Sequence, residues 1–356
     1  MSRLRERLLQ HWFGRARGGL LARVLQPLAA LYSVLQACDR RRRERRARAL
    51  QQPAVPVIVF GNLVVGGAGK TPVVIALVQA LQQAGWRPGI VSRGYGRRSA
   101  GLQAVDANAR ADAVGDEPLL IHRRTGAPVH VGRDRRAAAL ALLQRHPDVN
   151  VVIADDGLQH RELRREIEVV VFDERGLGNG RLLPAGPLRE PPPPQPGPRM
   201  LVLYNHPVAS TAWPGVVTSR RLGAAWPLAA WRAGDARRAQ PLAALRGRRL
   251  LAVAGIAVPE RFFSALEAAG LQIERLPLPD HFAYGALPPW PASTREIVTT
   301  EKDAVKLALP AADVVDAPAI WVVGLDLALP AEFTAALRAR LALGRERAAV
   351  DASPSA

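Results

Sequence analysis

The chain has 356 residues, a formal net charge of +18 at pH 7 and a single cysteine, Cys38. This length allows a large core in one or two domains, and one cysteine excludes an internal disulfide framework and is typical of a reducing compartment. The sequence has no uninterrupted apolar run of about eighteen residues, so no membrane-spanning helix is predicted.

Positive charge is concentrated at the N-terminus. Residues 1–50 contain thirteen arginines against three acidic residues, Glu6, Asp39 and Glu44. Such a basic arm indicates an anionic partner, either lipid headgroups or nucleic acid; the alternative is a solvated tail in an arginine-rich proteome.

Within this arm, residues 18–38 carry an apolar stripe at helical spacing, with Arg40 to Arg43 directly after it. The charge follows the apolar region, whereas a secretory signal carries it in front. We therefore predict that residues 1–50 form an amphipathic arm with a helix at the membrane interface. The alternative is a helix packed in the core.

Short β-rich runs alternate with helical patterns after the arm. Candidate strands are 55–60, 88–92, 149–154, 167–172, 200–204, 249–254, 271–276, 296–300 and 319–323. Candidate helices are 72–84, 116–124, 134–145, 259–269 and 331–342. Near-continuous apolar strands separated by helices predict an α/β fold with a doubly wound, mostly parallel sheet.

The same pattern suggests an order of domains. We expect a first domain over 53–222, a linker over 223–247, a smaller C-terminal α/β lobe over 248–343 and a disordered tail over 344–356. The proline-rich stretch 189–198 is expected to be a stiff surface loop.

A glycine-rich segment follows the first candidate strand and ends in Lys70 and Thr71. Strand, glycine turn, Lys-Thr and helix are the layout of a phosphate-binding loop, in which backbone N–H groups and the lysine contact phosphates and the threonine holds Mg²⁺. Val64 occupies the position of the first glycine of the usual pattern, and an ordinary glycine turn is the alternative. Only three lysines occur in the chain, which favours a specific role for Lys70. The fold expected is therefore of the P-loop NTPase type.

Acidic residues follow a second candidate strand. Asp155 and Asp156 end the run 151–154, where a carboxylate would order the Mg²⁺ shell. The alternative is a strand that ends in a polar turn.

Further polar residues lie near other strand ends or helix starts. Asp116 and Glu117 open a helical stretch, and His281 lies in a proline-flanked segment; a carboxylate and an imidazole could form a base for a hydroxyl. Arg93 follows a strand at the edge where ligands bind in such sheets. Residues 300–303, Thr-Glu-Lys-Asp, are weak evidence for a guanine-reading element.

Taken in order, these segments resemble the tetraacyldisaccharide 4′-kinase (lipid A 4′-kinase) family. The motifs that carry the resemblance are Gly61-Asn62 through Pro72, Ser92-Arg93-Gly94-Tyr95, Gly115-Asp116-Glu117-Pro118, Asp155-Asp156-Gly157-Leu158-Gln159-His160, residues 181–191, Pro279-Asp280-His281 and residues 300–303. Leu158 stands where the family usually has phenylalanine, which leaves the polar residues of that motif intact. Phe282 stands where the family often has a second histidine or another aromatic residue, so only His281 can take a catalytic role there. The ordered set is far more specific than the loop alone.

The resemblance implies transfer of the γ-phosphoryl group of ATP to the 4′-hydroxyl of tetraacyldisaccharide 1-phosphate, which gives lipid IV-A in lipid A biosynthesis. It implies ATP and Mg²⁺ as cofactors and a peripheral or monotopic location at the cytoplasmic face of the inner membrane. The partners implied are the lipid precursor and an anionic membrane surface, not nucleic acid. A P-loop GTPase or metal-insertion chaperone is the alternative.

Roles carried over by the resemblance fall on particular residues. Asp116 and His281 would form a base dyad, expected to meet across the cleft between the lobes, and Thr71 and Asp156 would hold the metal. The nucleotide would be bound by Val64, Val65, Gly66, Gly67, Ala68, Gly69, Lys70 and Thr71, with Arg93, Glu117, Arg135, Asp155, Gln159 and His160 in support.

Overall fold

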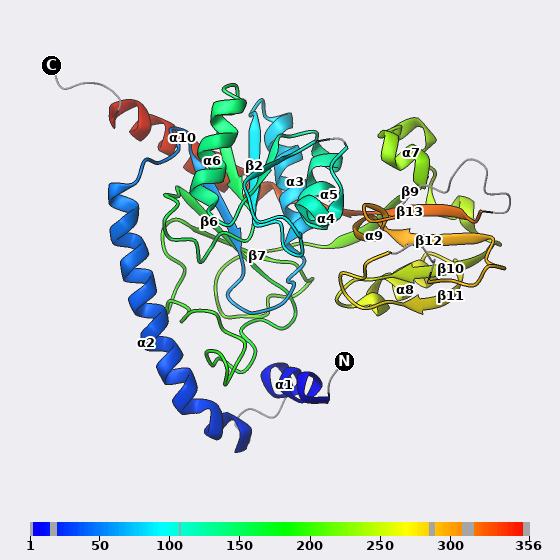
Figure 1. Cartoon of the computed structure of the whole chain (residues 1–356), viewed down its shortest axis with the longest axis horizontal. Coiled ribbons are helices and arrows are strands. Elements are labelled where there is room, and N and C mark those ends of the chain that lie inside the picture. The colour runs from blue at the N-terminus through cyan, green and yellow to red at the C-terminus, as the bar shows by residue number, and fades with distance from the viewer. Residues whose placement is uncertain (1–2, 15–19, 107, 285–288, 308–316, 352–356) are drawn as a thin grey trace. The chain divides into compact units, whose positions relative to one another are not determined.

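The computed structural model describes residues 3–14, 20–106, 108–284, 289–307 and 317–351 (Figure 1). Within these ranges the chain forms two compact units. The first comprises 1–93, 134–219 and 328–356, and the second comprises 94–133 and 220–327.

The first unit is built on a parallel sheet whose strands follow the order β2-β5-β1-β6-β7-β8. The strands are β1 (Val57–Gly61), β2 (Pro88–Ser92), β5 (Val151–Ala154), β6 (Ile167–Phe172), β7 (Met200–Tyr204) and β8 (Val216–Val217). Every residue of β1, β2, β5 and β6 is buried, as expected for strands covered on both faces. The mostly parallel α/β sheet predicted from the sequence is confirmed.

Helices of the first unit pack on this sheet. They are α3 (Lys70–Gln83), α6 (Arg135–Arg145) and α10 (Ala331–Asp351), which contact β1 and β2, β2, and β6 respectively. The helix α10 continues to Asp351 and so covers residues 344–351 of the stretch expected to be a disordered tail. Alanine, arginine and glutamate in that stretch are good helix formers. Residues 352–356 lie outside the described ranges.

Two further helices belong to the N-terminal arm, α1 (Arg3–Phe13) and α2 (Leu20–Ala49). The indole of Trp12 donates to the carbonyl of Pro184, and the hydroxyl of Tyr32 donates to the carbonyl of Arg189. Both helices are therefore tied to the segment that follows β6. No helix in the described parts of the chain is long and apolar enough to span a bilayer.

The second unit contains a sheet of order β11-β10-β12-β13-β9. Its strands are β9 (Arg220–Pro227), β10 (Arg249–Ala254), β11 (Gln272–Pro277), β12 (Glu296–Thr300) and β13 (Ala319–Leu327). All pairs are parallel except β13 with β9. The helices of this part are α7 (Leu228–Ala233), α8 (Pro259–Ala268) and α9 (Glu301–Ala304), with short 3₁₀ turns at Ala236–Arg238 and Leu242–Leu245.

The segment 223–247, which was expected to be a linker, instead contains most of β9, the whole of α7 and both 3₁₀ turns. The sequence of β9, Arg-Arg-Leu-Gly-Ala-Ala-Trp-Pro, has little alternation because it is an antiparallel edge strand whose residues are mostly half-buried. Its pairing with β13 could not be read from local periodicity.

Residues 94–133 also belong to the second unit. They form β3 (Gln103–Val105), α4 (Ala111–Val114), α5 (Asp116–Thr125) and β4 (Val129–Val131), with β3 and β4 paired antiparallel. Both units are therefore discontinuous in sequence, unlike the continuous segments expected, because the chain leaves the first unit after β2 and returns to it before α6.

Candidate active site

A glycine-rich loop joins β1 to α3. Gly66 and Gly69 have φ values of 94° and 64°, in the left-handed region that favours glycine. Gly69 immediately precedes α3 and, as a glycine, has no side chain to cap the backbone N–H groups of the first turn. Those groups and the positive end of the helix dipole point to where an anion would bind.

The remaining residues of the loop differ in burial and in their contacts. Val64 and Ala68 are buried, and the backbone N–H of Val65 donates to the carbonyl of Pro187 at 2.8 Å. A Cβ added to Gly67 would meet nothing within 4 Å, so the space beside this residue is open. The loop is thus anchored by its apolar residues and open at its glycines.

Two side chains from other strand ends hold the loop carbonyls. Arg175, after β6, donates to the carbonyl of Gly67 at 2.8 Å. Asn205, after β7, donates to Ala68 and Gly69 at 3.1 and 2.8 Å. The carboxyl ends of parallel strands meet at one edge of the sheet, where such folds bind ligands. Sequence analysis missed both residues, because neither lies in a recognisable phosphate-loop pattern.

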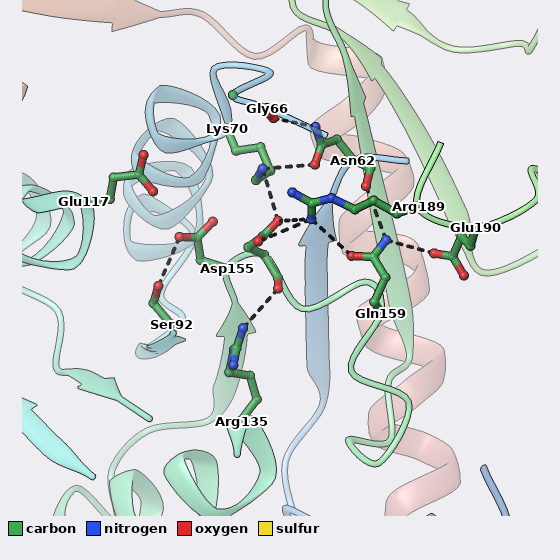
Figure 2. Close-up of polar contacts among 12 residues, drawn as sticks. Asn62, Gly66, Lys70, Ser92, Glu117, Arg135, Asp155, Gln159, Arg189 and Glu190 are labelled. Carbon is green, nitrogen blue, oxygen red and sulfur yellow. Dashed lines mark hydrogen bonds and ion pairs between the residues drawn. The ribbon is translucent and has the colours of Figure 1, made fainter. Parts of the chain in front are cut away.

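Lys70 is the first residue of α3 and points toward two oxygen acceptors. Its Nζ lies 3.1 Å from Oδ1 of Asn62 and 3.1 Å from Oδ1 of Asp156. Figure 2 shows Lys70, Asn62 and Arg189, from three different segments, pointing toward one another. Thr71 follows in the same helical turn.

Asp156 lies just after β5 and is held in the left-handed region, with φ of 50°. Its carboxylate accepts from Arg189 at 3.3 Å as well as from Lys70. Burial raises the pKa of this carboxyl, but the charges of Lys70 and Arg189 outweigh burial and hold the pKa below its ordinary value. Asp156 is therefore an anion at neutral pH, surrounded by cations at the loop.

Gln159 connects this carboxylate to a buried ion pair. Its Oε1 accepts from Arg189 at 3.3 Å, and its Nε2 donates to Glu190 at 2.9 Å (Figure 2). Glu190 is 3% exposed and pairs with Arg161 at 2.7 Å. Arg189 and Glu190 lie in a segment that the sequence motif includes, but the chain is so rich in arginine that sequence alone does not single out this pair.

Arg135 and His160 meet at the start of α6. Nε2 of His160 accepts from the backbone N–H of Arg135 at 3.0 Å, and the guanidinium of Arg135 donates to the backbone carbonyl of Asp156 at 3.3 Å. Burial, together with the charge of Arg93, lowers the pKa of Arg135 to about 10 against the opposing effect of nearby carboxylates. Arg135 thus supports the backbone at Asp156.

Asp155 and Arg93 differ in exposure although both lie at strand ends. Asp155 is buried and accepts from the hydroxyl of Ser92 at 3.3 Å (Figure 2), whereas Arg93 is exposed. The two neighbouring carboxylates Asp155 and Asp156 therefore have different partners, as expected for adjacent residues at the end of a strand.

The oxygen donors that would hold a metal at this loop are those of Thr71 and Asp156. Within the described ranges, no group of three or more His, Cys, Asp or Glu residues could hold a metal ion. Magnesium ordinarily takes one or two carboxylates and completes its shell with waters and nucleotide phosphates, so a hydroxyl and a carboxylate beside a phosphate loop fit this ion.

The second unit brings Asp116 and His281 together, although 165 residues separate them. Nδ1 of His281 lies 2.9 Å from Oδ2 of Asp116, the first residue of α5. His281 has φ of 59°, and the ring of Tyr95 lies 5.4 Å from its imidazole. The expectation that the two residues meet across a cleft between lobes is corrected: both belong to the same compact unit.

The hydrogen bond affects the pKa of both partners. The bond to Asp116 raises the pKa of His281 above its ordinary value, against burial and the charge of Lys302. Burial raises the pKa of Asp116, but the bond to His281 and the charge of Lys302 outweigh it and keep that pKa low. Asp116 is therefore ionised at neutral pH.

Glu117 and Lys302 lie beside this pair. Nζ of Lys302 is 3.3 Å from Oε1 of Glu117 and 3.3 Å from Nε2 of His281. Sequence analysis did not place Lys302 at the site, because the motif that contains it was weighed as a base-reading element.

A parallel α/β sheet and a glycine-rich loop that ends in Lys70 define a P-loop nucleotide-binding protein. Residues 21–342 match the family described as tetraacyldisaccharide-1-P 4′-kinase. The chain belongs to this family.

Curated relatives support the assignment over nearly the whole chain. The tetraacyldisaccharide 4′-kinase of Methylibium petroleiphilum is 53% identical over 340 residues, 94% of this chain and 93% of the relative. That of Leptothrix cholodnii is 49% identical over 342 residues, 96% and 97% of the two chains. The match does not favour the alternative of a GTPase or metal-insertion chaperone.

A solved structure is also similar. LpxK from Aquifex aeolicus, in a crystal structure described as a complex with ATP, is 25% identical and aligns with a TM-score of 0.71 over 90% of this chain and 100% of that one. The P-loop kinase fold expected from the sequence is thereby confirmed.

Proposed function

We propose that this chain transfers the γ-phosphoryl group of ATP to the 4′-hydroxyl of tetraacyldisaccharide 1-phosphate. The observation that carries the proposal is the family match over residues 21–342. The ATP named for the Aquifex structure supports the choice of nucleotide. Lipid IV-A is the expected product.

The loop of the first unit would bind the nucleotide. The backbone N–H groups at Gly69 and the start of α3 would bind phosphate oxygens, with Lys70 on the β- and γ-phosphates. Thr71 and Asp156 would hold Mg²⁺, which neutralises charge on the phosphates when bound. Arg189 would keep Asp156 ionised and oriented.

Asp116 would be the base. The imidazole of His281 already has Asp116 at Nδ1 and Lys302 at Nε2, so neither ring nitrogen is open to a substrate. The carboxylate retains acceptor capacity, because each oxygen has two lone pairs: Oδ2 faces His281, and among the described residues Oδ1 accepts a 3.2 Å bond from the backbone N–H of Glu117. The 4′-hydroxyl proton would pass to Asp116 while the 4′-oxygen bonds to the γ-phosphorus and ADP leaves.

Phosphorylation of the disaccharide 1-phosphate in detergent micelles tests this proposal. With γ-labelled ATP, we expect one labelled phosphate on the 4′-oxygen and none on an acceptor that lacks the 4′-hydroxyl. GTP in place of ATP tests the alternative function. Label transfer that is independent of the 4′-hydroxyl would contradict the proposal.

Lys70→Ala is the matched variant for this assay. Removal of the ammonium deletes a charge that stabilises the transferring phosphoryl group, so we expect kcat to fall by about 10²–10³-fold with the fold retained. Circular dichroism checks the fold, and unchanged turnover with ordinary ATP affinity would overturn the role of the loop.

We also propose that the N-terminal arm associates with an anionic membrane surface at the cytoplasmic face of the inner membrane, where the acylated acceptor would lie. One face of α2 is apolar and exposed, with Val24 63% and Leu35 60% exposed. The other members of this face are Leu21, Leu28, Leu31 and Val34. The arginines 40–43 continue the helix. A core helix would bury this face.

A further inference from the structure

The pair Asp116–His281 is surrounded by charged groups that the proposed reaction does not use. Lys302, on α9, is the centre of this cluster: its Nζ lies 3.3 Å from Glu117, 3.6 Å from Asp280 and 3.3 Å from Nε2 of His281. The Lys302 side chain is 20% exposed. Contacts with two carboxylates and one imidazole therefore fix the position of the Lys302 ammonium.

The direction of the Lys302–His281 bond follows from the chemistry of the two groups. An ammonium has three N–H donors and no lone pair, so Nε2 of His281 must accept and must itself be unprotonated. The only proton of the ring is then on Nδ1, where Asp116 accepts it at 2.9 Å. Lys302, His281 and Asp116 form a chain in which each bond runs toward the carboxylate.

We propose that Lys302 is a positioning residue of the reaction, whose ammonium occupies Nε2 of His281 and so holds the ring as a neutral imidazole that donates from Nδ1 to Asp116. The inference rests on the proposed function, because it matters for turnover only if Asp116 is the base. Lys302 does not touch the reacting atoms in this arrangement.

The charges around the ring act on its protonation in opposite directions. The groups that face His281 are Asp116 and Glu117 from α5, Asp280 from its own segment, Lys302 from α9 and the ring of Tyr95. Burial lowers the pKa of Lys302, but Glu117, Asp116 and Asp280 outweigh burial and raise it, so the ammonium stays charged. That charge opposes protonation of His281, which the bond to Asp116 favours.

Loss of the ammonium would therefore change the protonation state of the pair. Without Lys302, a proton on Nε2 would meet no positive charge, and Glu117 and Asp280 would attract it. The imidazolium would form at a higher pH and would bind Asp116 as an ion pair. Asp116 would then be a weaker base at neutral pH.

Nuclear magnetic resonance of the full chain labelled with ¹⁵N-histidine tests the charge state directly. The chain has seven histidines, and the His281→Gln variant identifies the signal of His281. We expect that neutral His281 carries its proton on Nδ1 and that the midpoint of its titration rises by about 1–3 pH units in Lys302→Met. Lys302→Arg, which keeps a donor-only cation, should stay close to the original midpoint.

Kinetics supply the second readout. In Lys302→Met the acid limb of the pH profile of kcat should move upward with the His281 midpoint, so that activity lost at pH 7 returns at high pH. A purely structural defect would lower kcat at every pH. Arg237→Met removes one positive charge from the same unit at a side chain that is 92% exposed, and it should change neither midpoint nor profile.

Each outcome of the two measurements either supports the proposed role of Lys302 or contradicts part of it. Equal His281 midpoints in the original chain and in Lys302→Met, or a neutral ring protonated on Nε2, would overturn the proposal. A raised midpoint with an unmoved kinetic profile would support the charge arrangement and overturn the role of Asp116 as the base. If Lys302→Met does not fold, Lys302→Gln undergoes the same two measurements.

Discussion

Asp116 and His281 would have unequal roles in the proposed reaction, although they form one hydrogen-bonded pair. The carboxylate is kept ionised by its neighbours, whereas both nitrogens of the imidazole are engaged. In the first unit Asp156 is likewise kept anionic by Lys70 and Arg189. Burial is outweighed at Asp116 by the hydrogen bond from His281 and the charge of Lys302, and at Asp156 by the charges of Lys70 and Arg189.

A double-mutant cycle on the pair should show non-additive losses. Because Asp116 and His281 act through one hydrogen bond, Asp116→Ala, His281→Ala and the double variant should each lose a similar part of kcat, about 10²–10⁴-fold. Single-turnover kinetics measure the losses, and ATP affinity should be unchanged. Strictly additive losses would show that the two residues act independently.

At the scale of elements, α5 and α9 each contribute residues both to the group around His281 and to a second network of ion pairs and hydrogen bonds. The first residues of α5, Asp116 and Glu117, contact His281 and Lys302 respectively. Arg124, near the end of the same helix, bonds Glu301 at 2.6 Å and Asp326 at 3.1 Å. Glu301, the first residue of α9, also accepts from the indole of Trp231 at 3.1 Å. This buried network fixes the two helices that carry Asp116 and Lys302.

Breaking the network on one side should destabilise the second unit. Arg124→Met leaves Glu301, which is 5% exposed, as a buried carboxylate without its cation, a change that costs about 3–5 kcal/mol. Urea unfolding measures the loss, and Arg124→Met combined with Glu301→Gln should cost less than the sum of the two. Arg275→Met, which breaks exposed pairs with Glu260 and Glu267, serves as the control and should change little. Equal effects in Arg124→Met and the control would contradict the argument.

The contact of α5 with the His281 segment should make stability depend on pH. The folded pKa of His281 lies above its unfolded value of about 6.5, so the pair contributes fully below that pH and its contribution is lost as the pH rises through the folded pKa. The lowered pKa of Asp116 acts at the acid end, with a contribution present above about pH 3.9 and lost as the pH falls through the folded value.

The urea midpoint of the original chain should therefore exceed that of His281→Gln most between about pH 4 and 6.5, with a smaller difference at pH 8–9. Unfolding followed by circular dichroism at several pH values measures this difference. A constant difference across the range would mean that the charge of His281 does not contribute to stability.

For the molecule as a whole, catalytic candidates are distributed over two discontinuous units, and the arm attaches to the first of them. Arg181 bonds Gln26 of α2, and Tyr32 bonds the backbone of Arg189, whose side chain contacts Asp156. Deletion of residues 1–38 would therefore disturb the loop region as well as remove the apolar face. Point substitutions on that face separate the two effects.

Leu28→Asp combined with Leu35→Asp should reduce binding to anionic vesicles by about tenfold or more, because two exposed leucines would no longer enter the interface. Sedimentation with phosphatidylglycerol-containing vesicles measures the effect. Val208→Asp alters an equally exposed apolar residue of the same unit outside the arm and should bind as before. Equal binding by the double variant and the control would contradict the membrane role of α2.

The sequence by itself determined the features that depend on neighbours in the chain. The apolar runs of β1, β2, β5 and β6, the glycine turn before Lys70 and the ordered motifs of the family are local patterns, so they gave the parallel sheet, the loop and the family. Only the tertiary structure decided which distant residues meet, because the order of strands and not the order of the chain sets those contacts. The tertiary structure brought His281 into hydrogen-bond contact with Asp116, Lys302 with His281, and Arg189 with Asp156. It also grouped residues 94–133 with the C-terminal sheet.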